Sequence, residues 1–154
     1  MLELLMAIAI VGLLMAVALK YYQTAIAKAR ISEGLMGSSE LRLRTHEHYA
    51  VTGHWLSVSA DEAKDEQRMA NTGLEQMVAE NGAITVQYPD SLQDLLGGSR
   101  LTLRPATRPH EQAMSLMWLC GQTAVPSGFV VQGDDQTDIP SLNLVAQCRS
   151  RGDE

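Results

Sequence analysis

The chain has 154 residues, enough for one domain of ordinary size with its own hydrophobic core. Its formal net charge of −6 argues against a dedicated nucleic-acid-binding protein, which normally carries a dense basic face. The two cysteines, Cys120 and Cys148, do not form a CxxC pair, so the sequence does not predict a structural zinc site. A single disulfide in an oxidising compartment is the simplest interpretation.

The N-terminus is dominated by residues 4–19, which contain no polar side chain. One interpretation is a secretory signal peptide, because Ala16 and Ala18 give a cleavage-like pattern, although the positive start is lacking. A second is a simple transmembrane anchor, since residues 1–19 span about 28 Å as a helix. The third is an anchor that later becomes the packing surface of a polymer.

Glu3 bears on this choice because a carboxylate in hydrocarbon costs a few kcal/mol unless it is paired or near the interface. Either Glu3 lies among lipid headgroups and does nothing more, or it seeks a positive partner. The terminal amine of a neighbouring subunit would be such a partner.

The helix is predicted to continue past Lys20 to Gly53, a rod of about 75 Å. We expect an apolar half at 1–24 and an amphipathic half at 25–53. At 100° per residue one face holds Ile31, Leu35, Leu43, His46, Tyr49 and Ala50. The opposite, charged face holds Arg30, Glu33, Glu40, Arg44 and Glu47.

Residues 54–81 are predicted as a connecting loop, with a short exposed helix at 61–70. An antiparallel sheet and a C-terminal loop follow at 82–154, so the fold class is α+β. Alternation and turn signals predict strands at 83–88, 100–105, 113–120 and 129–132. The strand at 113–120 is apolar on both faces, which is expected for a central strand lying over the helix.

Four stretches resemble type IV pilins. The first is MLELLMAIAIVGLLMAVALKYYQTAIAKARISEGL, which is similar to the family's N-terminal helix in its acidic residue, apolar run, interior Gly12 and Tyr-Gln. HYAVTGHW resembles the segment in which that helix gives way to a loop. MSLMWLCGQ and IPSLNLVAQCR resemble the two ends of the type IVa disulfide loop. Pilins and pseudopilins share the first motif, and the Trp-x-Cys-Gly-Gln stretch narrows the resemblance to pilins.

The resemblance implies a pilin fold, with Cys120 and Cys148 closing the C-terminal disulfide loop. It also implies a homopolymer formed through the N-terminal helices, with Glu3, Gly12 and Lys20 as assembly residues. Before assembly the subunit would sit in the inner membrane with its domain outside the cytoplasm. The prepilin peptidase and the pilus assembly machinery would be its partners.

Two positions depart from the family pattern. The family's glutamate is the fifth mature residue, after an N-methylated first residue, whereas here it is Glu3. We therefore expect either that two residues precede this start or that the processed end is unusual. Lys20 replaces a proline that interrupts the family's helix, which leaves Gly12 as the local weak point at about 1 kcal/mol relative to alanine.

No catalytic residue, metal site or cofactor is predicted. On a helix His46 and His48 point about 160° apart, so with His54 they are expected to be solvated or half-buried side chains. The aspartates of the GDDQTD loop lack a full series of calcium ligands, so an acidic solvated turn is the better interpretation. No Ser-His-Asp, Cys-His or glycine-rich phosphate signature is present.

Arginines near the sheet and the disulfide loop invite a second interpretation. Arg100, Arg104 and Arg108, joined by Arg149 and Arg151, could gather into a basic patch with weak contact to DNA or a host surface. The alternative is a solvated strand face. Residues 151–153 form an Arg-Gly-Asp tripeptide at the C-terminus, where chance explains it well enough.

The resemblance implies a structural subunit of a type IV pilus on the bacterial surface, serving motility, adhesion or DNA uptake. Two alternatives stay open: a minor pilin or type II secretion pseudopilin, and a monomeric membrane-anchored binding module. A soluble enzyme with an uncleaved signal peptide is a more distant alternative.

Overall fold

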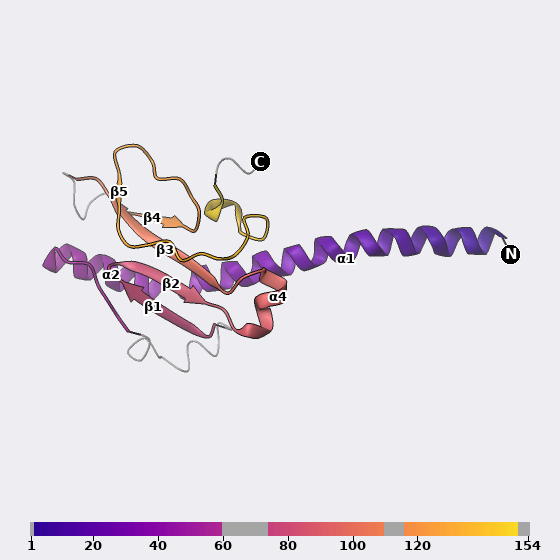
Figure 1. Ribbon diagram of the computed structural model, residues 1–154, viewed down its shortest axis with the longest axis horizontal. Coiled ribbons are helices and arrows are strands. Elements are labelled where there is room, and N and C mark those ends of the chain that lie inside the picture. Colours follow the sequence, from indigo (N-terminus) through magenta and orange to yellow (C-terminus); the bar gives the residue numbers. More distant parts are fainter. Residues whose placement is uncertain (1, 60–73, 110–115, 151–154) are drawn as a thin grey trace.

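The computed structural model describes residues 2–59, 74–109 and 116–150. Its helices are α1 (Leu2–Gly37), α2 (Ser39–Thr52) and α4 (Gln93–Leu96), with short 3-10 turns η1 (Asp90–Leu92) and η3 (Ala146–Cys148). Its strands are β1 (Gln76–Glu80), β2 (Ala83–Gln87), β3 (Arg100–Thr107), β4 (Met117–Cys120) and β5 (Val130–Val131). A long helix therefore packs its C-terminal half on a small sheet and extends alone beyond it (Figure 1). The predicted α+β fold is confirmed. The short helix expected at 61–70 lies outside the described residues.

The long helix runs through a single irregular residue, Ser38. The Ser38 amide donates to the carbonyl of Gly34 at 3.0 Å, and the Arg42 amide donates to the carbonyl of Ser38 at 2.9 Å, so the backbone ladder continues. The Ser38 hydroxyl donates to the carbonyl of Leu35 at 2.8 Å. The helix ends at Gly53, which adopts the left-handed φ of 72° and donates to Tyr49, as predicted.

After Ser38 in the sequence, the buried face of the helix differs from the predicted one. Buried residues on it include Ala27, Ile31 and Leu35, followed by Leu41 and Thr45. By contrast, Leu43 and Ala50, which we expected to be buried, are exposed. The buried residues continue a single stripe through Ser38, because Ala27 and Thr45 lie about five full helical turns apart. Burial of Thr45 is tolerated because its hydroxyl donates to the carbonyl of Leu41 at 2.7 Å.

The sheet is antiparallel in the order β1-β2-β3-β4, and β5 pairs with β3 outside this path. The prediction that the strand at 113–120 is central was wrong, because β4 is an edge strand whose first residue, Met117, is exposed. The central strand is β3, which pairs with three other strands. β1 lies within the segment 54–81 that we predicted as a loop, and it reaches β2 through the turn at Asn81 and Gly82.

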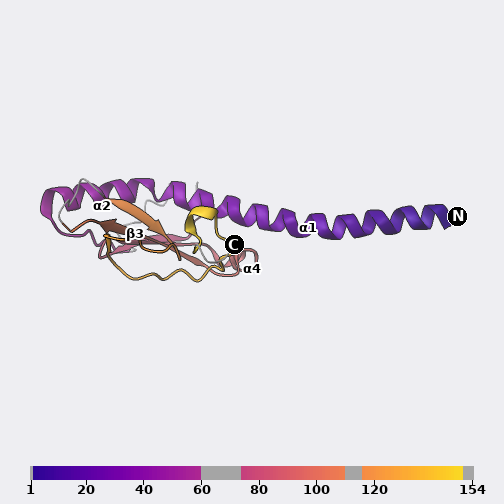
Figure 2. The same ribbon diagram turned by 90° about the horizontal axis from the view of Figure 1, so that it is seen from above.

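The sheet lies between two layers, the helix on one face and the C-terminal segment on the other (Figure 2). Leu101 and Leu103 of β3 belong to the core cluster that includes Ile31 of the helix. The intervening Thr102 meets the C-terminal segment, where its hydroxyl accepts from the amide of Gln136 at 3.0 Å. Because both faces are covered, β3 is buried despite its alternating polar sequence.

Candidate assembly interface

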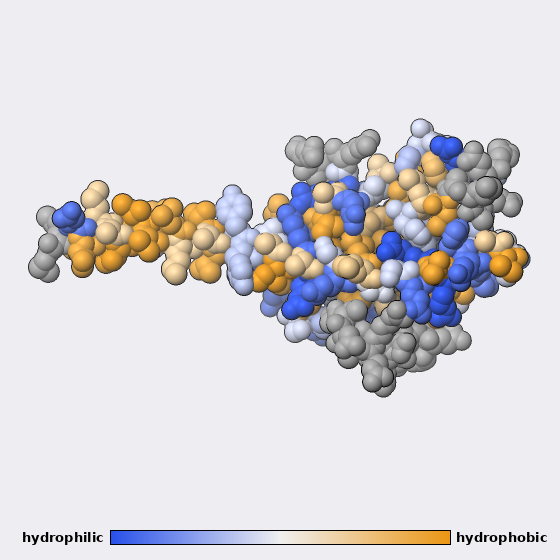
Figure 3. All heavy atoms as spheres, turned by 180° about the vertical axis from the view of Figure 1, so that it is seen from behind, coloured by the Kyte–Doolittle hydropathy of each residue, from blue (hydrophilic) through white to orange (hydrophobic). Residues whose placement is uncertain are grey.

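The first half of the helix projects from the domain as a bare apolar rod. Every Leu, Ile, Val and Met between Leu4 and Leu19 is more than half exposed, from 52% at Val17 to 71% at Leu4. Among the described residues, one helix, Glu3–Thr52, is long and apolar enough to cross a membrane. Figure 3 shows the rod as a mostly hydrophobic surface beside the mixed surface of the domain. Monomeric soluble proteins rarely expose so large an apolar surface.

The three predicted assembly residues lie along this rod and do not come together in one subunit. Glu3 is exposed in the first turn of α1. Gly12 has open space around it, since a Cβ there would meet nothing within 4 Å. Lys20 is exposed where the apolar run ends. Any shared role must therefore be exercised between subunits.

The rod is held at its base by a contact between the helix and Tyr88, which directly follows β2. The Tyr88 hydroxyl donates to the carbonyl of Ile31 at 3.2 Å, and its ring packs directly on Gly34. A Cβ at Gly34 would lie 2.8 Å from Cζ of that ring and closer still to its oxygen, so no larger residue fits without movement. Burial, and secondly the charge of Glu33, raise the pKa of Tyr88, which keeps its hydroxyl a proton donor.

The other end of the helix is closed by an aromatic stack. The rings of Tyr49 and Trp55 lie 3.9 Å apart and almost parallel, at 10°. Trp55 also lies against Gly82 of the β1–β2 turn. Gly53 allows the reversal that brings these rings together, because its left-handed φ is readily adopted without a Cβ. The Tyr-x-x-x-Gly-x-Trp spacing in HYAVTGHW thus ends the helix and brings the two rings together there.

The disulfide joins Cys120 of β4 to Cys148 of η3, with Cα atoms 4.5 Å apart and a sequence separation of 28. The disulfide ties the C-terminal segment to the edge strand β4. The described part of this segment has no long strand, so side-chain hydrogen bonds also hold it in place. Asn143 donates to the carbonyl of Leu96 at 2.9 Å, and Arg149 donates to the carbonyl of Leu144 at 2.9 Å.

The acidic loop, residues 133–138, holds this segment against β3. It is therefore more than the acidic solvated turn that we expected. Oδ1 of Asp138 accepts from the amides of Ser99 and Arg100, each at 2.7 Å, and its Oδ2 lies 3.2 Å from Nε of Arg100. Burial alone would raise the pKa of Asp138, but these amides and the guanidinium outweigh it and lower that pKa. Asp135 lies 3.6 Å from the guanidinium of Arg104, and its Oδ1 accepts from the amide of Thr137.

The three arginines of the predicted basic patch are therefore partly engaged within the subunit. Arg100 and Arg104 each face a carboxylate, and Arg104 also donates to the carbonyl of Gly121 at 3.2 Å. Arg108 lies over the ring of Phe129, 5.0 Å from its centroid. The patch stays a prediction, with less free positive charge than the sequence alone indicates.

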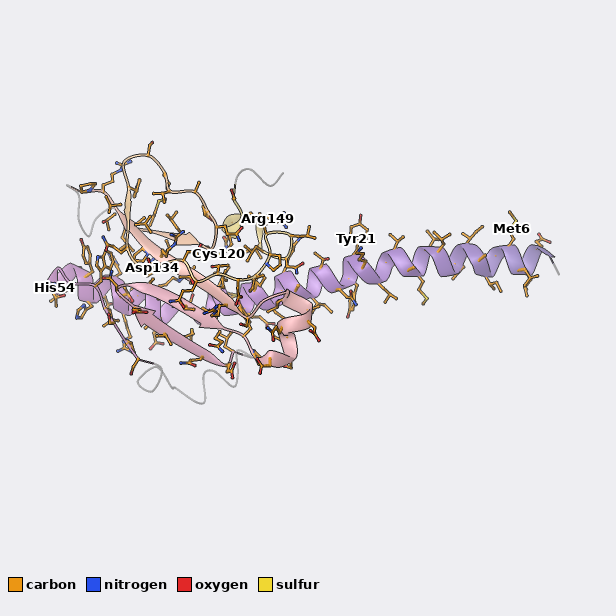
Figure 4. All side chains as sticks on the ribbon, viewed as in Figure 1. Met6, Tyr21, His54, Cys120, Asp134 and Arg149 are labelled. Atoms are coloured by element: carbon orange, nitrogen blue, oxygen red, sulfur yellow. A yellow bond between two sulfur atoms is a disulfide. The ribbon has the colours of Figure 1, made fainter. Side chains whose placement is uncertain are left out.

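Groups of three or more metal-ligating side chains are not found in the part of the chain that the structure describes. Nδ1 of His48 is 2.9 Å from the carbonyl oxygen of His54, so this ring helps to close the helix end. His54 lies at the tip farthest from the rod (Figure 4).

Sequence comparison relates this chain to a known family. The family model for pilins, which form bacterial filaments, matches residues 27–144. This chain belongs to the pilin family. A type IV major pilin, PilE1 of Neisseria gonorrhoeae, is 30% identical over 97% of this chain and 84% of its own length. A fimbrial protein of Neisseria meningitidis serogroup B is 29% identical over 99% of this chain and 94% of its own length.

As a type IV pilin, the protein is a structural filament subunit. The exposed rod anchors the pilin in a membrane before assembly, and the assembled pilus lies on the cell surface. The pilin family match begins at residue 27, the position of the first core residue, Ala27.

Proposed function

We propose that this pilin is the major subunit of a type IV pilus and that it polymerises through its exposed apolar rod, residues 4–19. The observation that carries the proposal is the rod itself, whose large side chains are more than half exposed from Leu4 to Leu19. In a membrane, lipid would cover this surface. In a filament, the rods of neighbouring subunits would replace lipid with contacts of similar polarity.

Glu3 gives the polymer its axial register in this proposal. An unpaired carboxylate in an apolar bundle is costly, so each Glu3 would pair with the terminal amine of a neighbouring subunit. Wrongly staggered subunits would leave the charge buried alone and would be disfavoured. Gly12 and Lys20 would then decide how the rod bends within the bundle.

The cellular steps follow from this arrangement. The prepilin peptidase would process the N-terminus, and the pilus assembly machinery would extract the anchored subunit from the inner membrane. The finished pilus would serve motility, adhesion or DNA uptake. The arginines at 100, 104 and 108 would supply weak contacts with DNA or a host surface, repeated along the filament.

The test is to express Glu3→Ala and Glu3→Gln chains and to image sheared surface material by negative stain. We expect folded, membrane-held subunits and few filaments, because Gln keeps the shape of Glu3 but carries no charge and cannot form an ion pair with an amine. Asp94→Ala, which removes an exposed carboxylate of α4, is the matched control and should assemble normally.

Normal filaments from both Glu3 variants would refute the role of this charge. The abundance of the chain in purified fibres decides between a major pilin and the alternative of a minor pilin or pseudopilin. A chain that forms no fibre at all would be a monomeric membrane-anchored module instead.

A further inference from the structure

Three polar side chains form a boundary between the apolar rod and the domain. Lys20, Tyr21 and Tyr22 follow Leu19 directly, and the two tyrosines are 76% and 64% exposed. Figure 4 shows Tyr21 standing clear of the domain, part-way along the projecting helix. Large amphipathic rings left in solvent together need an explanation beyond the fold of the subunit. We call this group the Lys-Tyr-Tyr girdle.

Within residues 2–59, 74–109 and 116–150, no side-chain hydrogen bond or ion pair joins the girdle to its own domain. The described chain offers Lys20 no carboxylate within ion-pair distance. The first fully buried helix residue is Ala27, which lies about 10 Å further along the axis at the rise of an α-helix. The girdle therefore occupies a bare stretch of helix with room around it.

The spacing along the helix matches the layers of a lipid bilayer. Glu3 and Lys20 are separated by about 26 Å of helix, close to the hydrocarbon thickness of a membrane of roughly 27–30 Å. The headgroup region adds roughly 5–7 Å on each side. With Glu3 at one boundary, Lys20 and both tyrosines reach the opposite headgroup layer, and the domain begins just outside it.

We propose that Lys20, Tyr21 and Tyr22 bind the phospholipid headgroups on the domain side of the membrane and thereby set the height of the domain above it. The ammonium group of Lys20 would pair with headgroup phosphate, extending along its aliphatic stem to reach it. The two rings would lie at the interface, with apolar bodies toward the acyl chains and hydroxyls toward water. This inference rests on the membrane-anchored stage of the proposed function. It adds phospholipid headgroups as the binding partner of residues 20–22.

The test uses the full chain, with its disulfide intact, in vesicles of phosphatidylethanolamine and phosphatidylglycerol. A single cysteine replaces Val17 or Gln23, which lie three residues before and after Lys20, and a membrane-impermeant maleimide reports its accessibility. We expect Gln23→Cys to react and Val17→Cys to be protected. Replacing all three girdle residues by leucine should let the helix sink and slow the reaction at Gln23→Cys about fivefold or more.

Two controls separate a headgroup contact from a general change in the helix. Lys28→Leu removes a lysine about 12 Å further along the helix and should leave both reaction rates unchanged. In maltoside micelles, which lack phosphate, Lys20→Gln alone should have no effect, whereas in the vesicles it should slow labelling of Gln23→Cys.

The outcomes distinguish a failure of membrane insertion from a failure of the girdle alone. If Val17→Cys reacts as fast as Gln23→Cys in the otherwise unchanged chain, the rod is not inserted, and both the anchored stage and the girdle are overturned. If Val17→Cys is protected but the leucine variant leaves Gln23→Cys unchanged, the girdle alone is overturned. An equal effect of Lys20→Gln in micelles and vesicles would also overturn it, because phosphate would then not be the partner.

Discussion

Gly34→Ala is the substitution that most directly tests how the helix is held on the domain. Helix propensity alone predicts that alanine stabilises this position by about 1 kcal/mol. The structure predicts the opposite sign, because a Cβ at Gly34 would overlap the hydroxyl of Tyr88 and lie 2.8 Å from its Cζ. Tyr88 is 1% exposed, so its ring has no solvent to move into.

The magnitude follows from three contributions. Overpacking a closed site typically costs about 1–3 kcal/mol. Displacing the hydroxyl from the carbonyl of Ile31 forfeits a hydrogen bond worth about 1 kcal/mol. The gain in propensity offsets about 1 kcal/mol of this sum. We therefore expect Gly34→Ala to lower the free energy of unfolding by about 1–3 kcal/mol.

Urea unfolding of the full chain in detergent micelles, followed by the fluorescence of Trp55 and Trp118, measures this change. Gly12→Ala is the matched control, since a Cβ there meets nothing within 4 Å, and it should not destabilise the domain. Adding Tyr88→Phe should make Gly34→Ala less harmful by about 1 kcal/mol, because the overlapping oxygen is gone. A Gly34→Ala chain as stable as the parent would show that the ring yields freely and would refute the reasoning.

Two further changes test the C-terminal segment. Cys120→Ser opens a loop of 28-residue separation, so the free energy of unfolding should fall by about 3–4 kcal/mol. Limited proteolysis should then cut near the C-terminus, and unchanged protease resistance would contradict this role. Because the pKa of Asp138 is lowered, its contribution to stability is present above the ordinary carboxyl value of 3.8 and is lost as pH falls through the lower folded value. Asp138→Asn should therefore destabilise the neutral protein and flatten its loss of stability in acid, as measured by thermal unfolding across pH.

The helix and its ending could be predicted from the sequence because their causes are local. An uninterrupted apolar run, an amphipathic continuation and a glycine at the end each act within a few residues. The same held for the turn at Asn81 and Gly82, where both residues have positive φ. That turn is a strong hairpin signal and could also have revealed β1 before it. The polar sequence QMVAE obscured the strand, because β1 is only partly buried.

The rest depended on contacts between distant segments. The core position of β3 arises because the C-terminal segment covers its polar face, which no pattern within RLTLRPAT discloses. Asp138 accepts hydrogen bonds from the amides of Arg100 and Ser99, which precede it by 38 and 39 positions in the sequence. Tyr88 and Ile31 are likewise 57 positions apart. Glu3, Gly12 and Lys20 stay predicted assembly residues, because a single subunit does not bring them together.

The contact between Tyr88 and Gly34 has a consequence at the far end of the molecule, because the helix is a lever with that contact at its fulcrum. Glu3 lies about 47 Å from Gly34 along the helix axis. A tilt of about 5° at the contact therefore displaces the carboxylate by about 4 Å, more than the full length of a hydrogen bond. Small errors of packing in the domain are magnified at the tip. In the proposed filament, a tyrosine and a glycine far from Glu3 would therefore decide how accurately a subunit presents that charge to its neighbour.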